Sequence, residues 1–165
     1  MNDCKEFVLD DLMAITAIPV DDIPARDLLS PANNLAPVME NDDLSPYPLA
    51  DAITIGLKPA VSGGALVPIK RFTGKAKDDE GDSVAGRLHT VSVSCEVDDR
   101  DNSVWNHLLT LERGAHHLLL TFRDGVTRAF VCASQDTYLC NAERDGSKTT
   151  VTFRIQCLMG IQLIV

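Results

Sequence analysis

The sequence lacks the segments that anchor a protein in a membrane or direct its secretion. No apolar run approaches the roughly 18 residues that a membrane-spanning helix needs. The first residues, Met1 to Glu6, contain neither the basic region nor the apolar stretch of a secretory signal. We therefore expect a protein without a membrane span that is made in, and stays in, a cytoplasm-like compartment.

Cysteine pairs and metal-binding motifs are also missing. None of the cysteines forms Cys-x-x-Cys, and no histidine follows one at zinc-finger spacing. Several lie on apolar faces of predicted strands, which favours buried, reduced thiols. His116 and His117 are neighbours in a predicted strand, so they should point to opposite faces and not bind one ion together. We predict no metal and no cofactor. The cysteines are Cys4, Cys95, Cys132, Cys140 and Cys157.

Catalytic motifs are absent as well. The chain has no Gly-x-Ser-x-Gly, no Gly-x-x-x-x-Gly-Lys-Ser/Thr and no Gly-x-Gly-x-x-Gly. These patterns form a nucleophile elbow, a phosphate-binding loop and a dinucleotide-binding turn. A Cys132–His117 pair across a hairpin would be a nucleophile arrangement, but nothing beyond composition favours it. We therefore expect a protein that is not an enzyme and has no catalytic residues.

Charge is distributed unevenly along the chain. The net charge is −9, and residues 1–50 carry ten acidic and two basic side chains, against fourteen and thirteen in residues 51–165. Sequence-independent DNA binding needs clustered Lys and Arg, and no such cluster occurs. We expect an acidic surface that can lie beside DNA without gripping it.

The chain divides near residue 50 into an acidic, proline-rich arm (residues 1–50) and a single β-rich domain (residues 51–165). Of the eight prolines, six lie between residues 19 and 48, a density at which neither a helix nor a central strand persists. Ahead of them, the apolar spacing over residues 5–18 predicts a short amphipathic helix.

Apolar residues recur at intervals through the arm, where a solvated linker would carry Ser, Gly, Gln or Lys. This pattern indicates an extended strap that lies in grooves of its own domain or of a neighbouring copy, and both interpretations stay open. The expected anchors are Ile23, Leu28, Leu29, Leu35, Val38, Met39 and Tyr47.

From residue 52 the apolar period changes to two, which is typical of strands. The clearest alternation runs from Leu88 to Val97, with Val91 and Val93 on the apolar face. Residues 73–86 carry three glycines and mixed charge without an apolar pattern, so we predict a long polar loop with a functional role. Further strands are predicted over residues 52–57, 66–72, 116–122, 126–133, 137–142 and 149–157.

One helix is predicted in this domain, over residues 104–113, with Ser103 as its N-cap and Gly114 at its end. Asp124-Gly125 and Asp145-Gly146 predict two successive hairpins. The order of elements favours a mainly β domain (all-β to α+β): an antiparallel β-sandwich or barrel with one flanking helix, preceded by the extended arm.

The stretch from Ile69 to Ile161 resembles bacteriophage tail tube proteins and related tail-assembly proteins of the neck or connector. The similarity lies in residues 69–77, the strand at 88–97, the short helix, the hairpin at 118–125 and the closing strand through Gly160-Ile161-Gln162. It covers a little over half of the chain and consists of strand and turn patterns.

The resemblance implies a structural protein of the virion, a β-sandwich subunit whose homo-oligomeric rings stack into a tube. Such a protein would assemble in the host bacterial cytoplasm, contact other tail or neck proteins, and let DNA pass without specific binding. The arm would strap a neighbour, and ring closure would join unlike faces. The loop would reach the next ring through Lys75, Lys77, Asp78, Asp79, Glu80 and Asp82.

A second hypothesis is a monomeric binding or accessory module. Such an adaptor would use the strap and the β-domain to bind a protein partner, and it would not assemble into rings.

Overall fold

The computed structural model describes residues 6–22, 50–57, 64–84, 86–123, 128–131, 138–157 and 162–164. Within these ranges the chain is mainly β with one helix, which confirms the predicted fold class. The elements are β1 (Glu6–Pro19), β2 (Ile53–Gly56), β3 (Ala65–Pro68), β4 (Gly74–Ser83), β5 (Gly86–Val97), α3 (Asn102–Arg113), β6 (His116–Phe122), β7 (Arg128–Val131), β8 (Tyr138–Asp145), β9 (Lys148–Cys157) and β10 (Gln162–Ile164).

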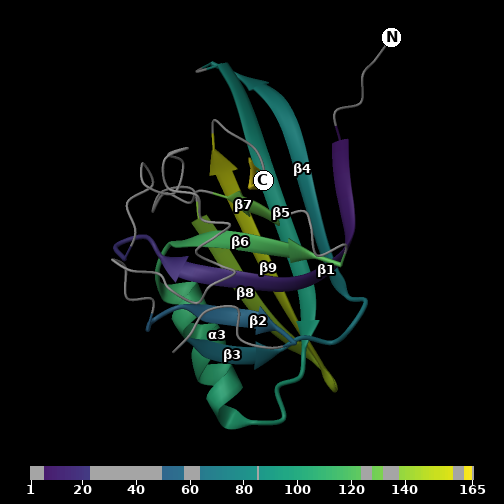
Figure 1. Cartoon of the computed structure of the whole chain (residues 1–165), viewed down its shortest axis with the longest axis vertical. Helices are drawn as coiled ribbons and strands as arrows, with labels where there is room; N and C mark the ends of the chain where they lie inside the picture. Colours follow the sequence, from purple (N-terminus) through teal and green to yellow (C-terminus); the bar gives the residue numbers. More distant parts are fainter. Residues whose placement is uncertain are drawn as a thin grey trace.

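The strands form one curled sheet, a half-barrel. Its order is β10-β7-β6-β1-β4-β5-β9-β8, with β2 and β3 branching from β1. In Figure 1, β6, the second half of β1, β2 and β3 run across the view, while β4, β5, β8 and β9 run steeply. The sheet was predicted to be antiparallel. It is mixed, because β2 and β3 pair in parallel.

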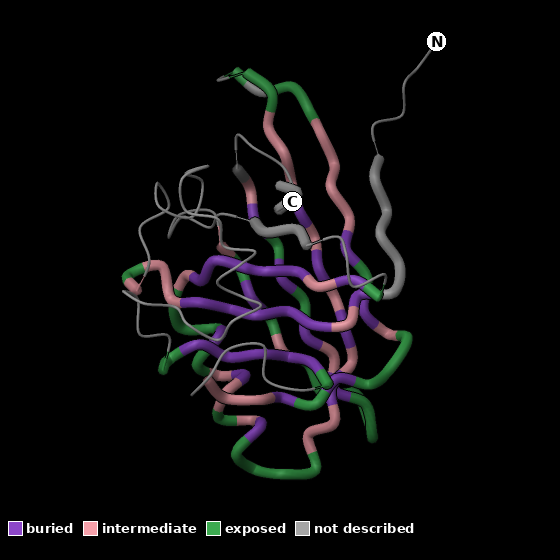
Figure 2. Tube along the Cα trace, in the orientation of Figure 1, coloured by how far each residue is buried: buried purple, intermediate pink, exposed green. Residues whose placement is uncertain are grey.

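The core lies inside the curl. Helix α3 contacts both β3 and β8, so it covers the opening between these two edges of the curled sheet. Figure 2 shows buried residues along the strands that face this space. Burying a Val, Ile, Leu or Phe side chain fully stabilises a fold by about 1.5–3 kcal/mol. The side chains with no exposed surface include Ile15, Ile55, Val67, Val91, Leu108, Leu111, Leu118, Leu120, Val151, Phe153 and Ile155.

The helix predicted over residues 5–18 is wrong, because residues 6–19 form strand β1. This strand has β4, β2 and β6 as neighbours, and its residues from Ala14 to Ile18 are buried on both faces. A strand buried on both faces shows a continuous apolar run instead of alternation. Short runs of that kind fit a buried helix equally well, which is why the pattern misled.

Strand β1 therefore belongs to the same sheet as the strands that follow residue 50. The division between arm and domain at residue 50 does not hold for residues 6–19. The remainder of the proposed arm, from residue 23 to residue 49, lies outside the described residues. So do all of its expected anchors, and their role stays a prediction: Ile23, Leu28, Leu29, Leu35, Val38, Met39 and Tyr47.

Strand β1 bends in the middle because it carries two extra residues. The register against β4 skips one residue between Asp10 and Leu12, and the register against β6 skips one between Leu12 and Ala14. Such bulges kink a strand and increase its twist. Before the bend β1 pairs with β4, and after it the same edge pairs with β2. The bend is thus where the sheet forks.

Helix α3 begins at Asn102, two residues before the predicted start, and its N-cap is not Ser103 as predicted. Asp101 is the N-cap and accepts a hydrogen bond from the Ser103 N–H at 3.0 Å. Ahead of the helix, Asp99 Oδ2 accepts hydrogen bonds from Arg144 Nε and Thr149 Oγ1, both at 2.7 Å, and so ties this segment to the β8–β9 hairpin. No helix within the described residues is long and apolar enough to cross a bilayer.

Both predicted hairpins of the last third are confirmed. Strands β6 and β7 pair antiparallel, as do β8 and β9. The predicted polar loop over residues 73–86 is wrong, because these residues form β4 and the start of β5, paired from Lys75–Ser94 to Ser83–Gly86. The outer part of this hairpin does not face the core, so its sequence shows no apolar alternation. Contacts between charged or histidine side chains, Glu80–Arg87 and Asp78–His89, join its two strands there.

Replacing Gly74 by Ala is expected to lower the free energy of unfolding by about 1–3 kcal/mol. A Cβ atom at Gly74 would lie 2.6 Å from the Leu12 carbonyl oxygen, at the bend of β1. Gly81→Ala is the matched control in the same strand, since a Cβ there meets nothing within 4 Å. Urea denaturation measures both variants, and equal stability of the two would contradict the close approach at the bend.

Candidate functional site

The β4–β5 hairpin extends beyond the rest of the sheet. On one side of the hairpin, the pairing with β1 stops at Glu6, which lies opposite Asp79. On the other side, the pairing with β9 stops at Cys157, which lies opposite His89. Residues 81–84 and 86–88, which we call the hairpin tip, therefore have pairing partners only among themselves in the described strands. Figure 2 shows this end as exposed. Two-stranded ribbons are only marginally stable alone in water, so the tip gains from packing on something else.

All six residues predicted to contact a neighbouring ring lie on β4. Four of them contact a charged or histidine side chain: Lys77 Nζ lies 3.3 Å from Asp79 Oδ2, and Glu80 Oε1 lies 2.8 Å from the Arg87 guanidinium. Asp78 Oδ1 lies 3.0 Å from His89 Nδ1. Exposed ion pairs such as Lys77–Asp79 contribute about 0–1 kcal/mol each, and the Asp78–His89 contact is partly buried. Lys75 and Asp82 are exposed. The hairpin beyond Val91 thus adds little to the stability of the core.

The turn between β3 and β4 is held firmly against the end of β5. Thr73 Oγ1 donates a hydrogen bond to the Lys70 carbonyl oxygen at 2.6 Å and accepts one from the Glu96 N–H at 3.1 Å. The Lys70 N–H donates to the Glu96 carbonyl oxygen at 2.8 Å. Because both ends of the turn are fixed, the residues between them have little freedom.

Phe72 lies in this turn with a backbone φ of 65°, in the left-handed region that bulky residues rarely adopt. Its side chain is 70% exposed. The Arg123 guanidinium carbon lies 4.9 Å from the centre of the Phe72 ring, a cation–π contact. A strained residue that presents an aromatic ring to solvent points to a role in binding.

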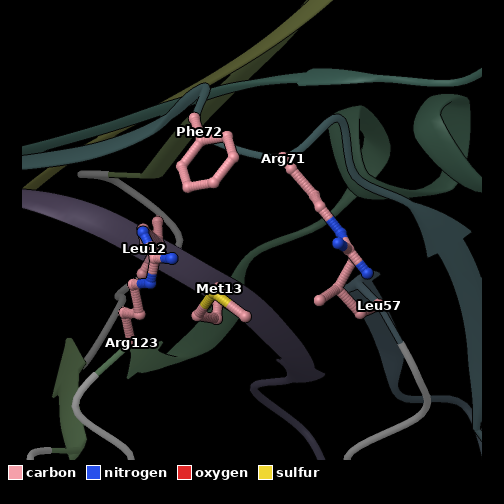
Figure 3. Close-up of a pocket in the computed structure, with 6 residues that line it drawn as sticks. All are labelled: Leu12, Met13, Leu57, Arg71, Phe72 and Arg123. Atoms are coloured by element: carbon pink, nitrogen blue, oxygen red, sulfur yellow. The ribbon is translucent and has the colours of Figure 1, made fainter.

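Phe72 forms one wall of a pocket of about 220 Å³, the corner pocket (Figure 3). Its residues come from four parts of the chain: the bend of β1, the end of β2, the β3–β4 turn and the end of β6. Leu12 is buried, Met13 is half-buried, and Leu57 is 43% exposed. The lining residues are Leu12, Met13, Leu57, Arg71, Phe72 and Arg123.

The corner pocket combines apolar walls with two exposed guanidinium groups. Among the described residues, no carboxylate lies within ion-pair distance of Arg71 or Arg123. Arginine binds carboxylates through paired hydrogen bonds and stacks on aromatic rings. The arrangement therefore suits a ligand that carries an acidic group beside an apolar one.

Among the described residues, the side chains of Cys95, Cys140, His116 and His117 are buried. Burial raises the pKa of the Cys95 thiol to about 12, and that of the Cys140 thiol also to about 12. Both thiols are protonated at neutral pH and act as small apolar groups. Burial lowers the pKa of His116, against the opposing effect of its hydrogen bond to the Gly114 carbonyl oxygen at 2.7 Å. His116 and His117 are successive residues of β6, so they lie on opposite faces as predicted.

Sequence reasoning singled out this part of the chain as a loop and not as a hairpin, and it missed the corner pocket. The pocket residues are far apart in the chain, and only the bend of β1 brings them together. Phe72 carried a weak signal, as a large apolar residue between two charged residues and Thr73-Gly74. Arg123 belonged to a predicted turn, where an exposed charge needs no explanation.

Phe72→Gly is expected to raise the free energy of unfolding by up to about 1 kcal/mol. Relief of the left-handed conformation gains about 1–2 kcal/mol, which exceeds the loss of an exposed cation–π contact of about 0.5–1 kcal/mol. Phe72→Ala is the matched variant, because it removes the ring and keeps the strain. Urea denaturation should rank Gly above Ala, and the reverse order would show that Phe72 is not strained.

Comparisons with protein-family models, with curated proteins and with solved structures found no match to this chain. The resemblance to tail-assembly proteins stays a prediction, and function is argued from the hairpin tip and the corner pocket.

Proposed function

We propose that this protein is a structural subunit of a bacteriophage tail or neck that self-assembles into rings or a tube and forms a conduit for DNA. It acts by assembly and not by catalysis. In this role it belongs to the virion, is assembled in the host bacterial cytoplasm, and contacts other tail or neck proteins. The mainly β fold with one flanking helix supports the proposal, since the resemblance implies such a fold.

The observation that carries the proposal is the hairpin tip. It extends beyond the core, and none of its described side chains is buried. A domain that acted alone would gain almost nothing from this extension. A subunit that contacts another copy gains an interaction surface from it. The net charge of −9 fits a conduit, because an acidic wall does not hold DNA.

A monomeric adaptor is the second candidate, and the corner pocket favours it. Concave sites with apolar walls and a few polar groups are typical of ligand binding. An acidic peptide of another protein would fit this pocket without any self-assembly. The two candidates differ in whether the purified chain associates with itself.

The full-length chain is expected to form rings or tubes at high concentration, as measured by sedimentation velocity and negative-stain electron microscopy. A variant in which Asn-Gly replaces residues 82–87 should remain a folded monomer. Asn-Gly suits a two-residue hairpin turn between Gly81 and Leu88, which are opposite each other in the register. Its free energy of unfolding should stay within about 0.5 kcal/mol of the original.

The control places the same Asn-Gly in the short β8–β9 turn, at Gly146 and Ser147, where nothing extends beyond the sheet. This variant should assemble like the original chain. A full-length chain that remains a monomer at every accessible concentration would refute self-assembly and favour the adaptor.

A further inference from the structure

We propose that the hairpin tip of one copy binds in the corner pocket of the next copy. This inference rests on the proposed self-assembly and names the two surfaces that meet. Asp82 at the tip and Arg71 and Arg123 at the pocket have no ion-pair partner among the described residues, and the tip and the pocket lie far apart in one chain.

The hairpin tip presents an acidic group beside an apolar one. Arg87 is already bonded to Glu80 at 2.8 Å, although its partner in the register is Asp82. Asp82 is exposed, and no cation among the described residues lies within ion-pair distance of it. Val84, two residues later, is fully exposed. An exposed valine at the end of a two-stranded ribbon can be buried by a partner.

The corner pocket presents the complementary groups. Arg71 and Arg123 supply positive charge without a carboxylate partner in the described part of the chain. Met13, Leu57 and the Phe72 ring supply apolar surface around a space of about 220 Å³. Asp82 would lie between the two guanidinium groups, and Val84 would lie against the apolar wall. The left-handed backbone of Phe72 keeps the ring turned outward for this contact.

A tip cannot reach the pocket of its own chain. Strand β4 starts at Gly74, next to the pocket, and ends at Ser83, at the tip. Ten residues of strand extend over about 30 Å at 3.3 Å per residue. The contact must therefore join two copies, and each copy offers one tip and one pocket. Contacts between unlike surfaces of identical chains produce either closed rings or open filaments.

Two variants separate the halves of this contact. The tip variant carries Asp82→Lys and Val84→Ser, and the pocket variant carries Arg71→Ser and Arg123→Ser. Each side chain is exposed, so the tip variant should keep the urea midpoint of the original chain, and the pocket variant should lose no more than the roughly 0.5–1 kcal/mol of the Arg123–Phe72 cation–π contact. Each alone should raise the concentration needed for assembly at least about tenfold, because one partner of a charge pair is gone. Arg154→Ser is the control, since it removes an exposed arginine from β9, away from the pocket, and should leave assembly unchanged.

The decisive measurement is sedimentation velocity of an equimolar mixture of the two variants. The mixture should form a 1:1 dimer that does not grow, because the intact tip of the pocket variant enters the intact pocket of the tip variant. A mixture that stays monomeric, or single variants that assemble like the original, would overturn the pairing while leaving self-assembly in place. Failure of the unmodified chain to associate would instead overturn the proposed function itself.

Discussion

The bend of strand β1 is the constraint on which the rest of the structure depends. One edge of β1 pairs with two different strands, with β4 before the bend and with β2 after it, because the extra residues change the direction of the strand. Gly74 permits this turn, since its missing side chain leaves space for the Leu12 carbonyl oxygen. If the bend were straightened, the sheet could not fork, the curl that encloses the core would open, and β2 would no longer lie near the start of β4.

The corner pocket is a direct consequence of the bend. The sheet forks there, so the end of β2, the β3–β4 turn and the end of β6 approach the same point. The hydrogen bonds of Thr73 then hold the turn in a conformation that Phe72 would not adopt alone. The same turn starts β4, whose far end is the hairpin tip. One element thus fixes both the position of the pocket and the direction of the tip, as a head-to-tail assembly requires.

The sequence predicted the parts of the fold that alternate and the parts that turn. Strand β5 alternates over Val91 to Val97 because one face meets the core and the other meets water, and the β8–β9 hairpin has its Asp-Gly turn. Strand β1 could not be recognised, because burial on both faces erases alternation and leaves a run that also fits a helix. The β4–β5 hairpin was missed for the opposite reason, since its outer half faces no core. The corner pocket depends on contacts between distant segments, which no local pattern records.

The central claim is that copies of this chain associate through the hairpin tip and the corner pocket. Hydrogen exchange of the full-length chain, measured at a low and at a high protein concentration, tests it most directly. Marginal ribbons and exposed turns exchange quickly when they are free. The account predicts that residues 71–73 and residues 81–88 become protected together as the chain assembles. Assembly that leaves these two segments unprotected, or protection that appears in only one of them, would contradict it.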